Sequence, residues 1–394
     1  MKEGWEYKKL GEVCSIERGG SPRPISDYIT DAENGINWIK IGDAVEGSKY
    51  IMSTAEKIKP EGMKKSRFVH KGDFILSNSM SFGKPYILGV DGCIHDGWLV
   101  IHDDSNTFNK DFLYYYLGSP TIYSEFKRLA VGGVVNNLNS NLVRGVKVAI
   151  PPLSEQQHIV EELDLLSSII EKKKAQLNEL DNLAQSLFYE MFGDPITNEK
   201  GWEVKKIGEI YKVTSSKRIL QSEWQSDGIP FYKVADIISL IEGKSMIPST
   251  FIAKSTYTEL KSQGLVPIQG DILVTSRGTL GKCYIVRETD EFYFQDGMIT
   301  WLTKGANCVT PVYTQRLFDN NRFLSAFLHN ANMSTVAYLS INQIVRKTIS
   351  LPPLVLQQQF ASKIEAIEHQ KELIKQSIKE VETLFNSRMD YYFN

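Results

Sequence analysis

The sequence predicts an α+β fold with two duplicated globular domains of mixed helix and strand, separated by long helices that form an antiparallel coiled-coil spacer. Three observations predict it. The first half of the 394-residue chain recurs in the second half. Short apolar runs dominate residues 1–150 and 195–350, which we assign as the two domains. A long heptad pattern follows each domain, in residues 151–194 and 351–394.

The duplication is visible as six matches that occur in the same order along both halves. Three of them are residues 4–13 with 201–210, 72–76 with 270–274, and 151–157 with 352–358. The offset stays between 193 and 201 residues. The copies share Gly, Pro and apolar framework positions, whereas the residues between these positions differ. This pattern favours one task performed on two targets, with plain drift after duplication as the alternative.

Strand-like runs bounded by Gly, Asp, Asn or Pro predict a sheet in each domain. In the first domain these runs cover residues 38–41, 74–77, 98–101 and 146–150. Apolar residues at roughly 3.6-residue spacing predict a helix over 109–118. The second domain repeats the plan, with strands expected at 272–275 and 298–302.

A long amphipathic helix is expected after each Pro-Pro-Leu. We predict Ser154 as the N-cap of the first helix, with Gln157 completing a capping box and Gly193 ending the helix. The apolar seams are Ile159, Leu163, Leu166, Ile170, Leu177, Leu180 and Leu187 in the first helix, and Phe360, Ile364, Ile367, Ile374, Ile378 and Val381 in the second. We expect the two helices to pack on each other as a coiled coil. The alternative is that each helix packs on its own domain.

The formal net charge of −2 is unevenly distributed. Residues 151–194 hold nine acidic residues against three lysines, whereas residues 205–350 hold 17 basic residues against 12 acidic ones. Basic side chains on polar, Gly-containing loops suit phosphate contact. The lysine-rich stretch 57–71 taken alone fits a solvated face equally well. The charge pattern therefore favours a nucleic-acid partner only in combination with the duplicated domains.

The sequence lacks the known signatures of catalysis and cofactor binding. Residues 278–283 have the wrong glycine spacing for a phosphate loop, and both Pro-Pro pairs precede Leu, unlike a methyltransferase motif. The six histidines do not cluster at metal-ligand spacing. His95-Asp96 has Gln295-Asp296 as its counterpart, which favours a turn over a catalytic dyad. We therefore predict no catalytic residue, cofactor or metal site in this chain.

The remaining composition predicts a cytoplasmic protein. The four cysteines are scattered and form no CxxC pair, which is typical of reduced thiols. There is no run of about 18 apolar residues, as a membrane span would need. The first residues lack the apolar core of a signal peptide.

Three motifs occur in both copies and carry a family resemblance. They are the opening Gly-Trp-Glu-x-Lys-Lys, the Gly-Asp-apolar strand with its following Gly-Lys, and Pro-Pro-Leu-x-x-Gln-Gln before the heptads. Together they resemble the specificity subunit of type I restriction–modification systems over essentially the whole chain. The second copy departs from the pattern, because Val355 replaces the serine of the predicted cap.

The resemblance implies two target-recognition domains that each read one half of a bipartite DNA sequence. The helices would set the gap between the half-sites and dock methyltransferase subunits, of which two are expected. A restriction subunit is a further candidate partner, and the system would serve DNA methylation and phage defence. S-adenosylmethionine, ATP and Mg²⁺ would bind to those partner subunits, so this chain would bind no cofactor itself.

Candidate DNA contacts lie on the loops that differ between the copies. For the first half-site they are Arg18, Ser21, Arg23, Lys40, Asn78 and Lys84, and for the second Lys217, Arg218, Lys233, Arg277 and Lys282. Arginine suits guanine edges, Asn78 suits adenine and lysine suits phosphates. The alternative function is a protein-binding scaffold that assembles through its helices. The salt dependence of DNA binding distinguishes the two.

Overall fold

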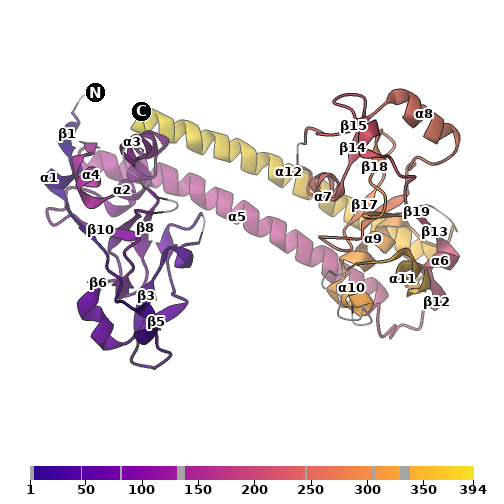
Figure 1. Ribbon diagram of the computed structural model, residues 1–394, viewed down its shortest axis with the longest axis horizontal. Helices are drawn as coiled ribbons and strands as arrows, with labels where there is room; N and C mark the ends of the chain where they lie inside the picture. The colour runs from indigo at the N-terminus through magenta and orange to yellow at the C-terminus, as the bar shows by residue number, and fades with distance from the viewer. Residues whose placement is uncertain are drawn as a thin grey trace. The chain divides into compact units, whose positions relative to one another are not determined.

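The computed structural model describes residues 4–45, 47–79, 82–130, 138–244, 246–303, 307–328 and 338–394. The chain divides into two compact units (Figure 1). The first unit combines Met1–Lys174 with Gln376–Asn394, and the second is Ala175–Lys375. Two 40-residue helices, α5 (Leu153–Phe192) and α12 (Leu354–Phe393), each contribute one stretch to each unit.

The first unit is built around a five-stranded sheet of order β2-β10-β7-β8-β4. Its strands are β2 (Ser15–Arg18), β10 (Trp98–His102), β7 (Phe74–Ser77), β8 (Pro85–Leu88) and β4 (Tyr50–Ile51). A second sheet contains β5 (Glu56–Ile58), β3 (Ile36–Ile39), β9 (Gly92–Ile94) and β6 (Arg67–Val69). A separate pair joins β1 (Glu6–Lys9) to β11 (Lys147–Ile150), and the helices are α1 (Leu10–Val13), α2 (Lys110–Leu117), α3 (Pro120–Ala130) and α4 (Ser140–Gly145).

The central strand β10 shows why this sheet is covered on both faces. Leu99 and Ile101 join the apolar core that includes the helices. Trp98 and Val100 join a second core with residues of the smaller sheet. Because side chains alternate along a strand, a strand that is apolar throughout belongs to both cores at once.

The second unit repeats this plan with a four-stranded sheet of order β13-β19-β16-β17. Its strands are β13 (Lys212–Thr214), β19 (Ile299–Thr303), β16 (Ile272–Thr275) and β17 (Cys283–Ile285). The smaller sheet holds β15 (Phe251–Ile252), β14 (Ile229–Tyr232) and β18 (Tyr293–Phe294), and β12 (Glu203–Lys206) pairs with β20 (Thr348–Leu351). The helices are α6 (Ile207–Ile210), α7 (Val234–Ile241), α8 (Lys254–Ser262), α9 (Pro311–Asp319), α10 (Asn321–Leu328) and α11 (Ile341–Arg346).

The predicted fold and its strands are confirmed. Strands β7 and β16 have the predicted bounds, and the other predicted strands are present with ends shifted by one or two residues. The largest shift is at β3, which ends at Ile39 because the chain enters a 3-10 turn at Ile41–Asp43. In the part of the chain that the structure describes, every helix is too short or too polar to cross a lipid bilayer.

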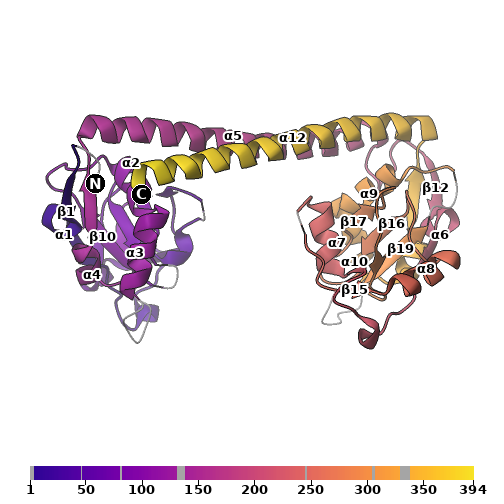
Figure 2. The ribbon, with the colours of Figure 1, turned by 90° about the horizontal axis from the view of Figure 1, so that it is seen from above.

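Within each unit, the stretches of α5 and α12 lie side by side along one side of the globular domain (Figure 2). In the first unit, Glu162 pairs with Arg388 at 2.8 Å, and Lys174 approaches Glu382 to 3.3 Å. Residue numbers rise along one helix as they fall along the other. The helices are therefore antiparallel, as predicted.

The ends of the helices also pack on globular domains, but each end packs on the domain that the other helix follows, which differs from the alternative of packing on its own domain. Phe192, at the end of α5, lies against Tyr313 of α9 with ring centroids 4.9 Å apart. Phe393, at the end of α12, lies against Phe112 of α2 at 5.7 Å. The two contacts are equivalent, because Phe393 stands 201 positions after Phe192 and Tyr313 stands 201 positions after Phe112. Each domain is thus closed by the end of the helix that follows the other domain.

Burial differs along the predicted helix seams. Ile159, Leu163, Leu166, Phe360, Ile364, Ile367 and Ile378 are buried, whereas Ile170, Leu177, Leu180, Leu187, Ile374 and Val381 are partly exposed. The fully buried positions include those that face a globular core, such as Ile159 and Leu163.

The predicted helix cap is wrong. Helix α5 begins at Leu153, so Ser154 lies inside it, and the carbonyl of Pro152 accepts from the backbone N–H of Gln156 at 3.0 Å. Gln157 makes no capping box and instead accepts from Asn109 Nδ2 at 2.9 Å. The first turn after Pro-Pro therefore needs no serine, which explains why the second copy lacks one.

A buried glutamine is the feature that the Pro-Pro-Leu-x-x-Gln motif provides. Gln156 is fully buried, and its Oε1 accepts from the Asn109 N–H at 2.7 Å. Its Nε2 donates to the carbonyls of Thr107 and Pro151 at 3.0 and 2.9 Å. Gln357 makes the same three contacts with the residues 201 positions further along. Each glutamine thereby fixes the start of a long helix to the start of α2 or α9.

Candidate nucleic-acid interface

Three loops meet at one edge of the large sheet in each unit. In the first unit, β2 and β7 both pair antiparallel with β10, so the ends of β2 and β7 lie beside the start of β10. The described residues of the loops at this edge are 19–24, 78–79 with 82–84, and 95–97. The second unit has the same arrangement, with residues 215–218, 276–281 and 295–298. We call each set the loop edge of its unit.

Asp96 is the centre of the first loop edge. Its backbone carbonyl accepts from Arg18 Nε at 2.9 Å, and its Oδ1 accepts from the Ser21 hydroxyl at 2.8 Å. Its Oδ2 lies 3.6 Å from Arg23 and 3.8 Å from Arg18. The structure therefore brings together three of the predicted DNA contacts. The side chains of Arg23 and Arg18 are 81% and 49% exposed, so both guanidinium groups are accessible to a ligand.

His95 is held as a neutral imidazole beside this cluster. Its Nδ1 accepts from the Gly97 N–H at 2.9 Å, and its Nε2 lies 2.9 Å from Asp96 Oδ1 and donates to it. Burial lowers the pKa of His95, and Arg23 and Lys40 lower it further, against the opposing effect of Asp96. The pKa of Asp96 is also lowered, because Ser21, His95 and the two arginines outweigh its partial burial.

The geometry of this pair fits a turn, as predicted, and both of the imidazole nitrogens already have hydrogen-bond partners. Among the residues that the structure describes, no group of three or more His, Cys, Asp or Glu side chains is placed to hold a metal ion.

Three other predictions for the first half-site are placed differently. Asn78 is 1% exposed and donates to the Asp96 carbonyl at 3.2 Å, so it supports the loop edge and cannot present its amide to adenine. Lys40 pairs with Glu56 at 2.6 Å. Lys84 lines a cavity of about 930 Å³ between the domain and the long helices, with Tyr115 and Asp164 on its wall.

In the second unit, Asp296 takes the place of Asp96. Its Oδ2 accepts from Arg218 Nε at 2.8 Å, and the Arg218 side chain is 73% exposed. Arg277 is exposed on the neighbouring loop and lies over the Tyr338 ring at 4.7 Å. Lys217 is also exposed, and its backbone N–H donates to the Tyr293 hydroxyl at 2.8 Å.

Lys233 is less accessible than the other candidates of the second unit. It is partly buried, its Nζ donates to the Thr250 hydroxyl at 3.1 Å, and it lies 4.4 Å from the centre of the Trp224 ring. It occupies the position of Lys40 in the first unit, and each lysine's backbone N–H donates to an aspartate three residues later. Both lysines therefore have structural partners before any ligand is considered.

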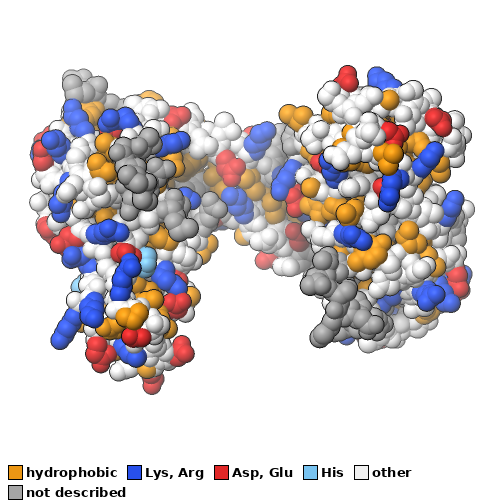
Figure 3. All heavy atoms as spheres, in the orientation of Figure 1, with side chains coloured by type: hydrophobic (Ala, Val, Ile, Leu, Met, Phe, Trp, Pro, Cys, Tyr) orange, Lys and Arg blue, Asp and Glu red, His pale blue; other side chains and the backbone are white. Residues whose placement is uncertain are grey.

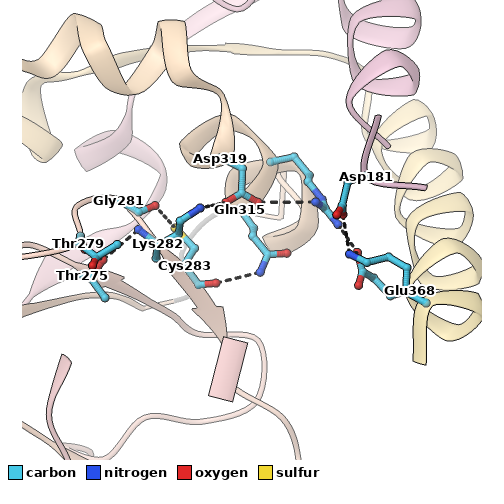
Figure 4. A network of polar contacts seen from close by, with 11 residues as sticks. Asp181, Thr275, Thr279, Gly281, Lys282, Cys283, Gln315, Asp319 and Glu368 are labelled. Atoms are coloured by element: carbon cyan, nitrogen blue, oxygen red, sulfur yellow. Dashed lines mark hydrogen bonds and ion pairs between the residues drawn. The ribbon is translucent and has the colours of Figure 1, made fainter. Parts of the chain in front are cut away.

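Lys282 begins a line of alternating charges that leads away from the loop edge (Figure 4). Its Nζ is 3.9 Å from Asp319, which lies 3.7 Å from Arg316 on the same helix, α9. Arg316 pairs with Glu368 of α12 at 2.8 Å. Lys371 then links Glu368, at 3.1 Å, to Asp181 of α5, at 2.7 Å.

Lysine and arginine side chains are spread over both units, with acidic side chains between them (Figure 3). Net charge alone therefore does not single out one surface, whereas each loop edge brings several of the predicted contact residues together. Sequence reasoning missed Asp96 and Asp296 as the residues that organise them. The available signal was the repeated Asp-Gly before β10 and β19, which occurs in both copies.

Comparisons with a family model and with known proteins all point to the same family. Residues 2–182 and 199–383 each match the family described as Type I restriction modification DNA specificity domain. A putative type I restriction enzyme specificity subunit of Haemophilus influenzae is 25% identical, with 98% of this chain and 94% of that protein covered. A type I restriction enzyme specificity subunit of Methanocaldococcus jannaschii is 24% identical over 93% of this chain and 87% of its own length.

Two solved structures share the fold at low sequence identity. One comes from a study of complex assembly and conformational transition of the type I R-M system, with a TM-score of 0.61 and 18% identity, covering 100% of this chain and 98% of that chain. The other is the S subunit of a type I restriction–modification system from M. genitalium, with a TM-score of 0.54 and 14% identity, covering 99% and 96%.

Proposed function

Because the chain belongs to the type I restriction–modification DNA specificity family, we propose that its two units each read one half of a bipartite DNA target. The observation that carries this proposal is the pair of loop edges. Each is built on the same strands around an aspartate paired with exposed arginine, yet the surrounding side chains differ. A conserved frame with different exposed groups suits two different base sequences.

The proposed contacts follow from accessibility. Arg18 and Arg23 are the candidates for base edges in the first half-site, and Arg218 and Arg277 in the second. Lys217 and Lys282, both exposed, are candidates for phosphates. Ser21 and Asn78 position the first loop edge.

The chain is a specificity subunit, and catalysis belongs to its partner subunits. We propose that α5 and α12 set the gap between the half-sites and dock two methyltransferase subunits, with a restriction subunit as a further partner. S-adenosylmethionine, ATP and Mg²⁺ would bind to those partners, and the complex would act in the cytoplasm. The exposed leucines of the helices, such as Leu165 and Leu373, support a docking role.

Methylome sequencing tests the proposal directly. The full chain is co-expressed with a methyltransferase subunit in a host without other methylation, and the wild type should methylate one discrete two-part sequence. Arg277→Ala should relax one half of that sequence only, because a bidentate arginine–guanine contact is worth about 1–3 kcal/mol. Arg287→Ala is the control, since Arg287 is exposed at the opposite edge of the same sheet. Full occupancy of an unchanged motif in Arg277→Ala would remove Arg277 from the interface.

Salt dependence distinguishes the proposal from the scaffold alternative. DNA binding through phosphates should weaken by orders of magnitude between about 50 and 200 mM salt. A protein-binding scaffold would show no sequence-selective DNA binding at any salt concentration, and that result would overturn the proposal.

A further inference from the structure

We propose that Asp96 and Asp296 are specificity-determining residues that hold the arginines of their loop edges for base contact and discourage the same arginines from binding phosphate. This inference rests on the proposed function and adds residues that do not themselves need to touch DNA. In each unit, the proposed role depends on the negative charge of one carboxylate and on its position beside the arginines. The two carboxylates occupy the same turn, directly before Gly97 and Gly297.

Asp96 fixes its arginines through both backbone and side chain. Arg18 is held by two points of contact, the Asp96 carbonyl at Nε and the carboxylate near its terminal nitrogen. Arg23 is held at one terminal nitrogen only. Each guanidinium therefore keeps further N–H donors for a ligand, while its position is restricted. An arginine restricted in this way loses less freedom when it binds a base edge.

The carboxylate is itself fixed and charged. Ser21 and His95 both donate to Oδ1, which leaves Oδ2 for the arginines. The lowered pKa of Asp96 keeps the group ionised at neutral pH. A fixed negative charge beside the arginines weakens their attraction to the DNA backbone, which is the sequence-independent part of binding. Contact between these arginines and the base edges in a DNA groove is therefore favoured over contact with phosphates.

The second unit has the same kind of contact between an aspartate and an arginine, but with Arg218 alone. Asp296 is 19% exposed in its side chain and pairs with Arg218 Nε at 2.8 Å. Ser215 fixes the turn, because its hydroxyl accepts from the Gly297 N–H at 3.1 Å and donates to the Ile299 carbonyl at 3.2 Å. The hydrogen bonds around the two aspartates differ, yet both copies place a carboxylate against a loop-edge arginine. This repetition supports a role in reading DNA beyond the local turn.

The test uses Asp96→Asn and Asp296→Asn in the full chain with its methyltransferase subunit. Asparagine keeps the size of the side chain and removes its charge. We expect Asp96→Asn to reduce discrimination at one half-site by about tenfold and to leave the other half strict. Affinity for random DNA should rise, with the slope of log affinity against log salt steeper by about one. Asp296→Asn should relax the other half-site, and less strongly, because one arginine is released instead of two.

Controls separate this role from a structural one. Asp31→Asn removes an exposed carboxylate of the first unit outside the loop edge and should change neither property. Asp96→Glu keeps the charge and should retain weak binding to random DNA. If Asp96→Asn leaves the motif and random-DNA affinity unchanged, the inference is wrong. It is also wrong if Asp96→Asn impairs both half-sites equally and lowers the unfolding temperature. A wild type without a discrete two-part motif would overturn the proposed function itself.

Discussion

Helices α2 and α9 occupy equivalent places in the two units but join the long helices by different chemistry. In the first unit, the Tyr115 hydroxyl donates to Asp164 of α5 at 2.5 Å. In the second, Arg316 stands 201 residues after Tyr115 and pairs with Glu368 of α12. The comparison shows that the duplicated frame preserves where a contact is made and not how it is made.

The difference extends to the loop edges. Asp319 links Arg316 to Lys282, whereas the equivalent residue in the first unit, Gly118, has no side chain for such a link. The first unit instead uses Lys49, which pairs with Asp111 at 2.5 Å and Asp164 at 3.3 Å. Each domain therefore makes an ionic contact with the long helices from a different element, the loop residue Lys49 in the first unit and Arg316 of α9 in the second.

The largest effects should come from the apolar contacts that the two units share. Phe192→Ala and Phe393→Ala each remove a ring that is buried against the α9 or α2 core, and each should cost about 3–5 kcal/mol. Hydrogen exchange, followed unit by unit, should show loosening of the second unit in Phe192→Ala and of the first in Phe393→Ala. Leu384→Ala, at a half-exposed position of α12, serves as the control. Loosening of the opposite unit would contradict the reciprocal packing.

The buried glutamines should also behave alike. Gln156→Ala and Gln357→Ala each leave one backbone N–H and two carbonyls without their partner, which should cost about 2–3 kcal/mol in either unit. Chemical denaturation with a probe in each unit measures this. Unequal losses of stability in Gln156→Ala and Gln357→Ala would show that the two buried glutamines are not equivalent.

Mutations of the ionic contacts between each domain and the long helices should affect the two units differently. Lys49→Met removes the cation that pairs with Asp111 and Asp164, from a side chain only 16% exposed, and should cost about 2 kcal/mol. Arg316→Met removes an 18% exposed cation from Asp319 and Glu368 and should cost less, because Lys282 and Lys371 still lie near these carboxylates. Only Arg316→Met should also increase exchange in the loop edge, because Asp319 connects Arg316 to Lys282. Equal effects on both loop edges, measured by hydrogen exchange, would argue against the distinction.

The smallest effect concerns pH. Burial raises the pKa of Asp319 above its ordinary value, against Arg316 and Lys282. A carboxyl group with a raised pKa in the folded state binds its proton more tightly there, so the contribution of Asp319 to the stability of the second unit should fall as pH rises above about 4. Asp319→Asn should flatten this dependence by less than about 1 kcal/mol. Unfolding midpoints measured from pH 4 to 7 in both proteins test this, and identical curves would refute it.

Local and repeated patterns were sufficient to predict much of this fold. Strands β7 and β16 follow from short apolar runs, and the long helices follow from their heptads. The role of Asp96 could not be predicted, because it depends on loops that are 75 to 78 residues apart in the chain. Asn78 was misjudged for the same reason, since its burial results from the way these loops fold over it. Whether a loop residue is exposed depends on how all the loops of the loop edge pack together, which the local sequence does not determine.

The reciprocal closure of the units has a consequence for synthesis. All residues of the second unit, Ala175–Lys375, leave the ribosome before Gln376–Asn394, which complete the first. The first unit therefore cannot complete its core until the whole second unit has been synthesised. At about 5–20 residues per second, translation leaves an interval of roughly 10–40 seconds between Lys174 and Gln376. During that interval, Phe112 and Tyr116 lack the aromatic partner that Phe393 later supplies, so this part of the first core stays without its cover until synthesis ends.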